Sequence, residues 1–270
     1  MFSKRFVKIF ENGSEKMNKN DLARAITKAG LILLENGAET YRVEDTMKRI
    51  CYAYGASVVD AYATPTLVII SFSLGNELYH NIKRTQLKSV DLHKIDLVND
   101  LSRRIQKETI PLDEFYHQLE RIEKEEKYSP MILRGGAAIC TFGFAFFFGS
   151  SFQDAICALL LGALIESFTL KIDDLGIHSF FKYIVSGALV TLMAIGLHTL
   201  GLCHNIDTVI ISVNMLLVPG LAMTNAIRDL VSGDLVSGLA RSQEAIFIAI
   251  AIALGSGIVF ALTGGYGYVI

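Results

Sequence analysis

Hydrophobic and polar positions alternate in two different ways along the first 130 residues of this chain. In residues 19–36, Leu22, Ile26, Ala29 and Leu33 recur at helical spacing. Stripes of this kind predict four helices: 19–36, 40–55, 91–107 and 112–127. Runs rich in β-branched and aromatic residues predict three strands: 57–63, 66–74 and 77–86. The pattern therefore predicts an α+β domain over residues 1–130, whose last, densely charged helix is a solvated connector.

From residue 131 onward the pattern changes to long apolar stretches. A transmembrane helix needs about 20 mostly apolar residues. Five stretches approach that length: 132–150, 154–171, 183–203, 206–226 and 244–263. The sequence thus predicts an α-helical polytopic membrane protein, with about five transmembrane helices in residues 131–270 following the α+β domain.

Charge supports this division. Residues 1–130 contain 20 Lys and Arg and 19 Asp and Glu, whereas residues 131–270 contain only 5 and 8. The net charge of −2 gives no bulk electrostatic reason to expect a nucleic-acid partner. The expected surroundings of the second part are a lipid bilayer.

The basic residues of the short loops predict the orientation. Loops 150–154 and 203–207 contain no Lys or Arg, and the two alternate loops carry four: Lys171, Lys182, Arg228 and Arg241. Positive loops stay in the cytosol. We therefore expect a cytosolic N-terminal domain, insertion in the cytoplasmic membrane and an external C-terminus.

A charged motif lies at the start of the second predicted helix, and it allows two interpretations. Its polar members are Glu39, Thr40, Arg42, Glu44 and Asp45. Oppositely charged residues three or four positions apart are typical of an exposed, ion-paired helix. The alternative is a polar binding site closed by strand residues: Asp60, Tyr62, Thr64 and Thr66. The residues alone favour the ion-paired helix.

Motifs of catalysis and metal binding are missing from the sequence. It has no GxxxxGK[ST], GxSxG or HExxH motif, and its six histidines and four cysteines lack metal-ligand spacing. We therefore expect no cofactor, no bound metal and no enzymatic activity.

The fourth predicted span is unusually polar. It contains Asn214, Pro219, Gly220, Thr224 and Asn225. Pro removes a backbone hydrogen bond, and irregular backbone at membrane depth occurs where it is packed in protein or lines a wet cavity. Discontinuous helices of this kind form the binding sites of secondary transporters. A simple proline kink, with the polar groups bonded to neighbouring helices, remains equally compatible with the sequence.

The loop that follows contains DLVSG twice, preceded by Arg228. Arg228 could hold a carboxylate through two hydrogen bonds, or it could pair with Asp229 or Asp234 at the cytosolic surface. Glu166 lies inside the second predicted span, where a carboxylate is a candidate functional group, although it is close to the end of that span.

Several motifs in order resemble the threonine/serine exporter (ThrE) family: GAETYRVEDTMKRI, AYATPTLVIISFS, and LVPG followed by TNAIRDLVSGDLVSGLAR. The resemblance covers most of residues 20–260. It implies a cytosolic domain and five spans, followed in fused members by five more. This chain is similar to the larger, YjjP-like subunit of the split form, whose partner is a small five-span YjjB-like membrane subunit. The split form is associated with succinate export and the fused form with threonine and serine export.

We therefore expect export of a small carboxylate metabolite by a two-protein secondary transporter. The predicted substrate pathway contains Asn214, Pro219, Gly220, Thr224, Asn225, Arg228 and Asp229. Glu166 is the candidate coupling group. Two alternatives stay open, namely a membrane-anchored enzyme and a regulatory or assembly subunit acting through the cytosolic domain. Homo-oligomerisation also stays open.

Overall fold

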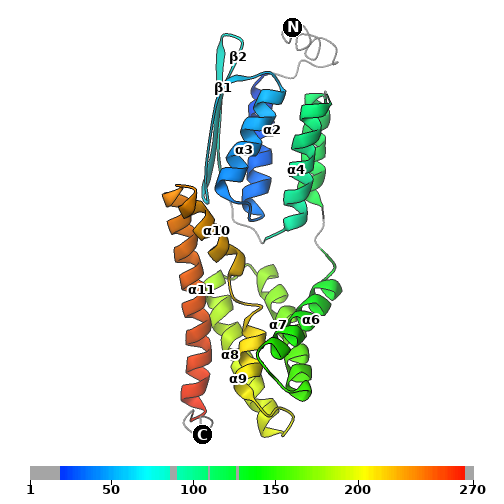
Figure 1. Ribbon diagram of the computed structural model, residues 1–270, viewed down its shortest axis with the longest axis vertical. Helices are drawn as coiled ribbons and strands as arrows, with labels where there is room; N and C mark the ends of the chain where they lie inside the picture. The colour runs from blue at the N-terminus through cyan, green and yellow to red at the C-terminus, as the bar shows by residue number, and fades with distance from the viewer. Residues whose placement is uncertain (1–18, 86–89, 109, 126–127, 265–270) are drawn as a thin grey trace. The chain divides into compact units, whose positions relative to one another are not determined.

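The computed structural model describes residues 19–85, 90–108, 110–125 and 128–264. By its internal contacts the chain forms two compact units. The first contains Met1–Lys127 and Leu221–Ser242, and the second contains Tyr128–Gly220 and Gln243–Ile270. The sequence predicts one membrane domain over residues 131–270, whereas Leu221–Ser242 pack with the N-terminal part. Figure 1 shows the elements of both units.

Four helices of the N-terminal part lie where the apolar stripes predicted them. They are α2 (Lys19–Glu35), α3 (Thr40–Ala53), α4 (Leu92–Lys107) and α5 (Leu112–Lys124). The predicted end of the last helix, at 126–127, lies outside the described residues. Helix α2 ends at Glu35, and Gly37, in the turn that follows, has a φ of 95° that suits a residue without Cβ. The Ala38 N–H donates to the Leu33 carbonyl.

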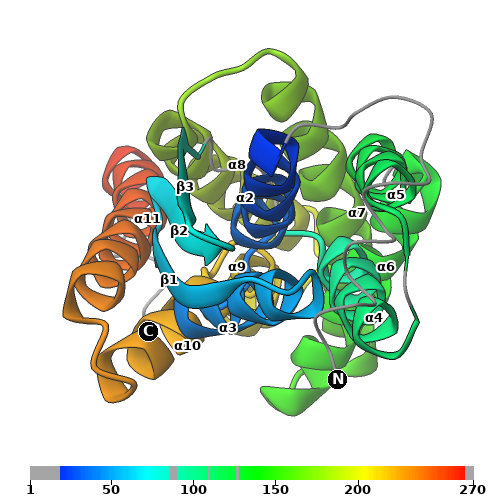
Figure 2. The same ribbon diagram turned by 90° about the horizontal axis from the view of Figure 1, so that it is seen from above.

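The three strands form one antiparallel sheet in the order β1-β2-β3. They are β1 (Ser57–Thr64), β2 (Leu67–Leu74) and β3 (Glu77–Arg84), so they agree with the predicted ranges within two residues. Residue 86, the predicted end of β3, is not described. Because side chains alternate along a strand, Val68, Ile70 and Phe72 of β2 all lie on the buried face. Helices α2 and α3 cover that face (Figure 2).

The second unit contains long apolar helices. Among the described residues, four helices are long and apolar enough to cross a membrane: α6 (Pro130–Phe147), α7 (Phe152–Asp174), α8 (Ser179–Thr199) and α11 (Leu235–Leu262). This judgement rests on length and composition. Helix α11 begins in the first unit and continues into the second, since the boundary follows Ser242.

The fourth predicted span is two helices instead of one. Helix α9 (Ile206–Asn214) ends before the proline, and α10 (Gly220–Val231) begins after it. Pro219 has no N–H to continue a helix, and it disfavours helical backbone in the residue before it. Of the two interpretations of residues 206–226, the structure therefore agrees with the discontinuous helix and not with a simple kink.

Small residues bring helices of the second unit into close contact. A Cβ added at Gly255 of α11 would lie 2.0 Å from the Ile184 carbonyl oxygen of α8, and one added at Gly187 would lie 2.6 Å from the Ile252 carbonyl oxygen. The Ser256 hydroxyl donates to the Gly187 carbonyl at 3.3 Å. Helices α8 and α11 therefore pack backbone against backbone, as small residues permit in membrane proteins.

Candidate functional site

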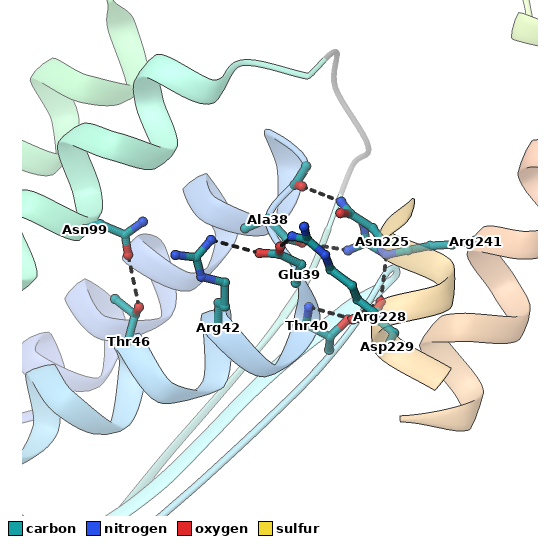
Figure 3. A network of polar contacts seen from close by, with 11 residues as sticks. Ala38, Glu39, Thr40, Arg42, Thr46, Asn99, Asn225, Arg228, Asp229 and Arg241 are labelled. Atoms are coloured by element: carbon teal, nitrogen blue, oxygen red, sulfur yellow. Dashed lines mark hydrogen bonds and ion pairs between the residues drawn. The ribbon is translucent and has the colours of Figure 1, made fainter. Parts of the chain in front are cut away.

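A polar network joins the turn between α2 and α3 to α10 and the start of α11, all within the first unit (Figure 3). We define the polar network by eight residues: Gly37, Ala38, Glu39, Thr40, Asn225, Arg228, Asp229 and Arg241. The turn residues of the network lie far in the sequence from its residues in α10 and α11, since Thr40 and Asp229 are 189 positions apart. Packing therefore brings together the charged motif and the first DLVSG repeat.

Two carbonyl groups of the turn after α2 accept hydrogen bonds from side chains of α10 and α11. The Asn225 side-chain amide donates to the Gly37 carbonyl at 2.8 Å, and Arg241 Nη2 donates to the Ala38 carbonyl, also at 2.8 Å. The Gly37 and Ala38 carbonyls lie in the turn after α2, and neither belongs to a helix. These donors therefore satisfy groups that the turn would otherwise leave unpaired.

The amino end of α3 is satisfied by a buried carboxylate. Asp229 is 0% exposed and accepts from the Thr40 N–H at 3.2 Å and the Thr40 hydroxyl at 3.0 Å. Arg241 Nε lies 3.2 Å from Asp229 Oδ2, so the anion is also ion-paired. Burial raises the pKa of Asp229, and the lowering effects of Arg241 and Thr40 only partly oppose it. The anion at the start of α3 is thus neutralised by a cation from α11.

Glu39 lies between two arginines at the edge of this network. It is the residue before α3, and it is buried. One oxygen accepts from Arg228, and the other accepts from Arg42 Nη1 at 3.2 Å. Burial alone would raise the pKa of Glu39, but hydrogen bonds from Arg228, its own backbone and Arg42 bring it below the ordinary value. Glu39 is therefore held as an anion.

Of the remaining residues of the charged motif, one forms the ion pair that the helical spacing predicted and another does not. Asp45 pairs with Arg49, as the spacing predicted. Glu44 instead accepts from the Ala63 N–H of β1 at 2.9 Å, and burial raises its pKa. The strand residues of the alternative site are mostly turned away, since Asp60, Tyr62 and Thr66 are exposed and Thr64 alone is buried.

The structure changes the expected ion-pair partner of Arg228, whereas the interpretation that Arg228 holds a substrate carboxylate stays a prediction. Arg228 pairs with Glu39, whereas the predicted surface partners were Asp229 and Asp234. Asp229 pairs with Arg241, for which the sequence predicted only the role of a loop charge. No local pattern signals a pair between Arg228 and Glu39, which lie so far apart in the chain, so sequence reasoning misses this contact.

The predicted pathway residues are divided between the units. Asn214, Pro219 and Gly220 belong to the second, and Thr224, Asn225, Arg228 and Asp229 belong to the first. The Asn214 side-chain oxygen is buried without a hydrogen-bond partner among the described residues. Thr224 is exposed. Their role in a pathway therefore stays a prediction.

Glu166 lies in α7 and is partly buried. The Thr169 hydroxyl donates to its carboxylate at 3.5 Å, a long contact within one helical turn. Within the part of the chain that the structure describes, no group of three or more His, Cys, Asp or Glu could hold a metal ion.

The loops without basic residues meet in the second unit. Asp154, at the start of α7, is 1% exposed and accepts from the His204 N–H at 2.7 Å. The Gln153 side-chain amide donates to the Leu202 carbonyl at 3.1 Å. These contacts place the 150–154 and 203–207 loops at the same end of the helices, which agrees with their equal lack of Lys and Arg.

A mostly helical chain with four apolar helices of spanning length has the architecture of a multi-pass membrane protein. The chain belongs to the ThrE family, whose model is described as "Putative threonine/serine exporter" and matches residues 24–263. The family resemblance of the motifs is thus confirmed.

Curated relatives are similar at low identity. A "Probable threonine/serine exporter" of Mycobacterium tuberculosis is 21% identical over 83% of this chain and 43% of its own length. A "Threonine/serine exporter" of Corynebacterium glutamicum is 23% identical over 85% of this chain and 48% of its own length. The "Probable succinate transporter subunit YjjP" of Klebsiella aerogenes is 18% identical over 93% of this chain and 96% of its own length. The chain thus spans less than half of the two threonine/serine exporters. No solved structure matches it.

Proposed function

We propose that this chain is one subunit of a secondary exporter that moves a small carboxylate metabolite out of the cell across the cytoplasmic membrane. The observation that carries the proposal is the break between α9 and α10, which leaves polar residues and irregular backbone inside an otherwise apolar stretch. Transporters place their sites at breaks of this kind. Family membership supports export as the activity.

A second subunit is part of the proposal. The YjjP relative is named a subunit, and this chain spans nearly all of it, whereas it spans less than half of the two threonine/serine exporters. A five-span, YjjB-like membrane protein would supply the remaining half. If this chain crosses the membrane five times, such a partner would run in the opposite sense, as inverted repeats do in many alternating-access transporters.

Topology is tested by reporter fusion. We expect residues 1–130 in the cytosol and the C-terminus outside, because the basic loops all lie on one side of the predicted spans. A reporter that is active only in the cytosol should be silent after Ile270 and active after a residue of the 171–182 loop. Activity at Ile270 would show that the chain crosses the membrane an even number of times.

Arg228 is the proposed anchor for the substrate carboxylate. Its side chain is 61% exposed although it pairs with Glu39, and a guanidinium has five N–H donors, so donors remain for a ligand. Lys would keep the charge but lose the planar fork. Arg228→Lys and Arg228→Gln should therefore each lower flux about tenfold or more, the size expected for losing one charge-assisted hydrogen bond.

The assay is counterflow of labelled succinate and labelled threonine in liposomes that contain both subunits. Arg103→Gln, at an exposed position of α4, is the matched control and should leave flux unchanged. Liposomes with this chain alone should show no specific flux. Wild-type rates in both Arg228 variants, with normal insertion, would contradict the anchor role, and flux without the partner would contradict the two-subunit arrangement.

A further inference from the structure

The sheet of the first unit has a second face, opposite α2 and α3, which we call the outer face (Figure 2). Side chains alternate along β2, so Leu67 and Ile69 lie on the outer face, whereas Val68 and Ile70 lie on the buried one. An antiparallel sheet with one face in water usually alternates apolar with polar residues. Strand β2 is apolar on both faces from 67 to 70, a pattern that is typical of strands buried on both sides. The sequence of β2 therefore indicates that another surface covers the outer face.

An apolar row crosses all three strands of the outer face. Tyr62 of β1 is paired with Ile69 of β2, and Ile69 is paired with Ile82 of β3. Residues directly opposite each other on antiparallel strands point to the same face. Both ends of the row are open to solvent, since Tyr62 is 45% exposed and Ile82 is 56% exposed. Contiguous exposed apolar side chains of this kind mark interaction surfaces.

The neighbouring row is polar, and its two ends are complementary. Asp60 of β1 is paired with Ser71 of β2, and Ser71 is paired with His80 of β3. Asp60 and His80 are both exposed, and they lie on opposite edge strands of the sheet. A carboxylate accepts hydrogen bonds of the kind that an imidazole N–H donates. The outer face thus has an acceptor on one edge and a donor at the same level on the other edge.

These two rows are self-complementary about a two-fold axis that runs parallel to β2 above Ile69. Rotation about that axis lays β1 of one copy over β3 of a second copy, so each Asp60 faces the His80 of the other copy. The two ends of the apolar row meet in the same way, and Ile69 faces Ile69. An axis across the strands at the same place would instead bring His80 against Arg84, whose row lies on the other side of Ile69. Because both of those side chains are donors, the axis parallel to β2 gives the better match.

We propose that the outer faces of two copies of this chain pack against each other in a two-fold symmetric homodimer. Each strand has eight residues, so the face measures about 26 Å along the strands and about 14 Å across them. That footprint is smaller than the roughly 800 Å² per partner of a standard interface. The contact is therefore weak between dissolved molecules and is favoured when both copies are confined to one membrane. The homodimer is a property beyond export, and it depends neither on the substrate nor on Arg228.

The test uses membranes from cells that produce the full-length chain without a second subunit. Cys140→Ser removes the exposed thiol and leaves the three buried cysteines in place. In this background Ile69→Cys places a thiol beside the axis, so a short bis-maleimide should join two copies into a product of twice the mass. Arg103→Cys, at an exposed position of α4, is the matched control and should give no such product. Adding Ile82→Asp to the Ile69→Cys chain should lower the yield about tenfold or more, because the contact would bury an unpaired carboxylate.

Two edge positions test the symmetry without changing Ile69. Asp60→Cys and His80→Cys chains that carry different tags should cross-link to each other when they are produced together. Each should cross-link far less to itself, because its counterpart in the second copy lies over the opposite edge. The inference would be overturned by the absence of these mixed products, by equal self-linking of Asp60→Cys, or by an equal product from Arg103→Cys. Cross-linking of Ile69→Cys only into products of another mass would also overturn it, since a different protein would then cover the outer face.

Discussion

Replacing Gly255 by alanine should destabilise the second unit strongly. The added Cβ would lie 2.0 Å from the Ile184 carbonyl oxygen and 2.8 Å from the Ala188 nitrogen, both of which are backbone atoms of α8. Backbone atoms within a helix cannot move aside as a flexible side chain can, so α8 and α11 must separate. Overpacking of this kind costs about 1–3 kcal/mol and occasionally more. We therefore expect a clearly lower thermal unfolding midpoint.

The measurement can use the buried thiols, because the chain has no Trp to report unfolding. Cys157 and Cys203 are buried in the second unit, whereas Cys51 is buried in the first unit and Cys140 is exposed. In a chain with Cys51→Ser and Cys140→Ser, the reaction of the two remaining thiols with a thiol-specific dye on heating therefore marks the opening of the second unit. Gly257→Ala is the matched control, since a Cβ there meets nothing within 4 Å on the same helix. Equal midpoints for the two variants would show that the close contact between α8 and α11 does not form.

Replacing Arg241 by glutamine should release α10 and the start of α11 from the rest of the first unit. Asp229 would remain fully buried without its cation, and the Ala38 carbonyl would lose its donor. Breaking one side of a buried ion pair costs about 3–5 kcal/mol. Hydrogen exchange should therefore increase in residues 221–242 and in the turn between α2 and α3, while α5 stays protected.

Two further variants test whether the unpaired Asp229 charge causes the loss of stability in Arg241→Gln. Arg241→Gln combined with Asp229→Asn removes the buried charge and should recover part of the loss. Arg228→Gln breaks a pair whose arginine is 61% exposed, and the buried Glu39 keeps its pair with Arg42, so the loss of stability should be smaller than in Arg241→Gln. If hydrogen exchange in residues 221–242 were no faster in Arg241→Gln than in Arg228→Gln, the buried Asp229–Arg241 pair would not be the contact that holds these residues in the first unit.

The effect of pH in the Arg241→Gln variant has a definite sign. Burial already raises the folded-state pKa of Asp229, and removing Arg241 removes the main lowering influence. An acid whose pKa is higher in the folded state than in the unfolded state binds protons preferentially when folded. The free energy of unfolding should therefore rise as pH falls from neutral through the folded pKa, so mild acid should partly restore the variant.

Local elements of this protein could be predicted from its sequence because their causes are local. The stripe of Leu22, Ile26, Ala29 and Leu33 defines α2, and the three runs of β-branched and aromatic residues define the sheet. Length and apolar content likewise identified α6, α7, α8 and α11 as helices that are long and apolar enough to cross a membrane. In the fourth predicted span, Pro219 indicated either a kink or a discontinuous helix, and only the structure shows two separate helices, α9 and α10.

The site was decided by tertiary structure. Glu39 and Thr40 were singled out as charged or polar helix-start residues, and Arg228 and Asp229 as loop residues, but their pairing depends on how α10 packs against the turn after α2. Hydrophobic periodicity carries information over a few helical turns, whereas these partners lie 189 positions apart. A single sequence therefore determined which side chains were available for a polar site, and only the packing of the chain decided which carboxylate met which arginine.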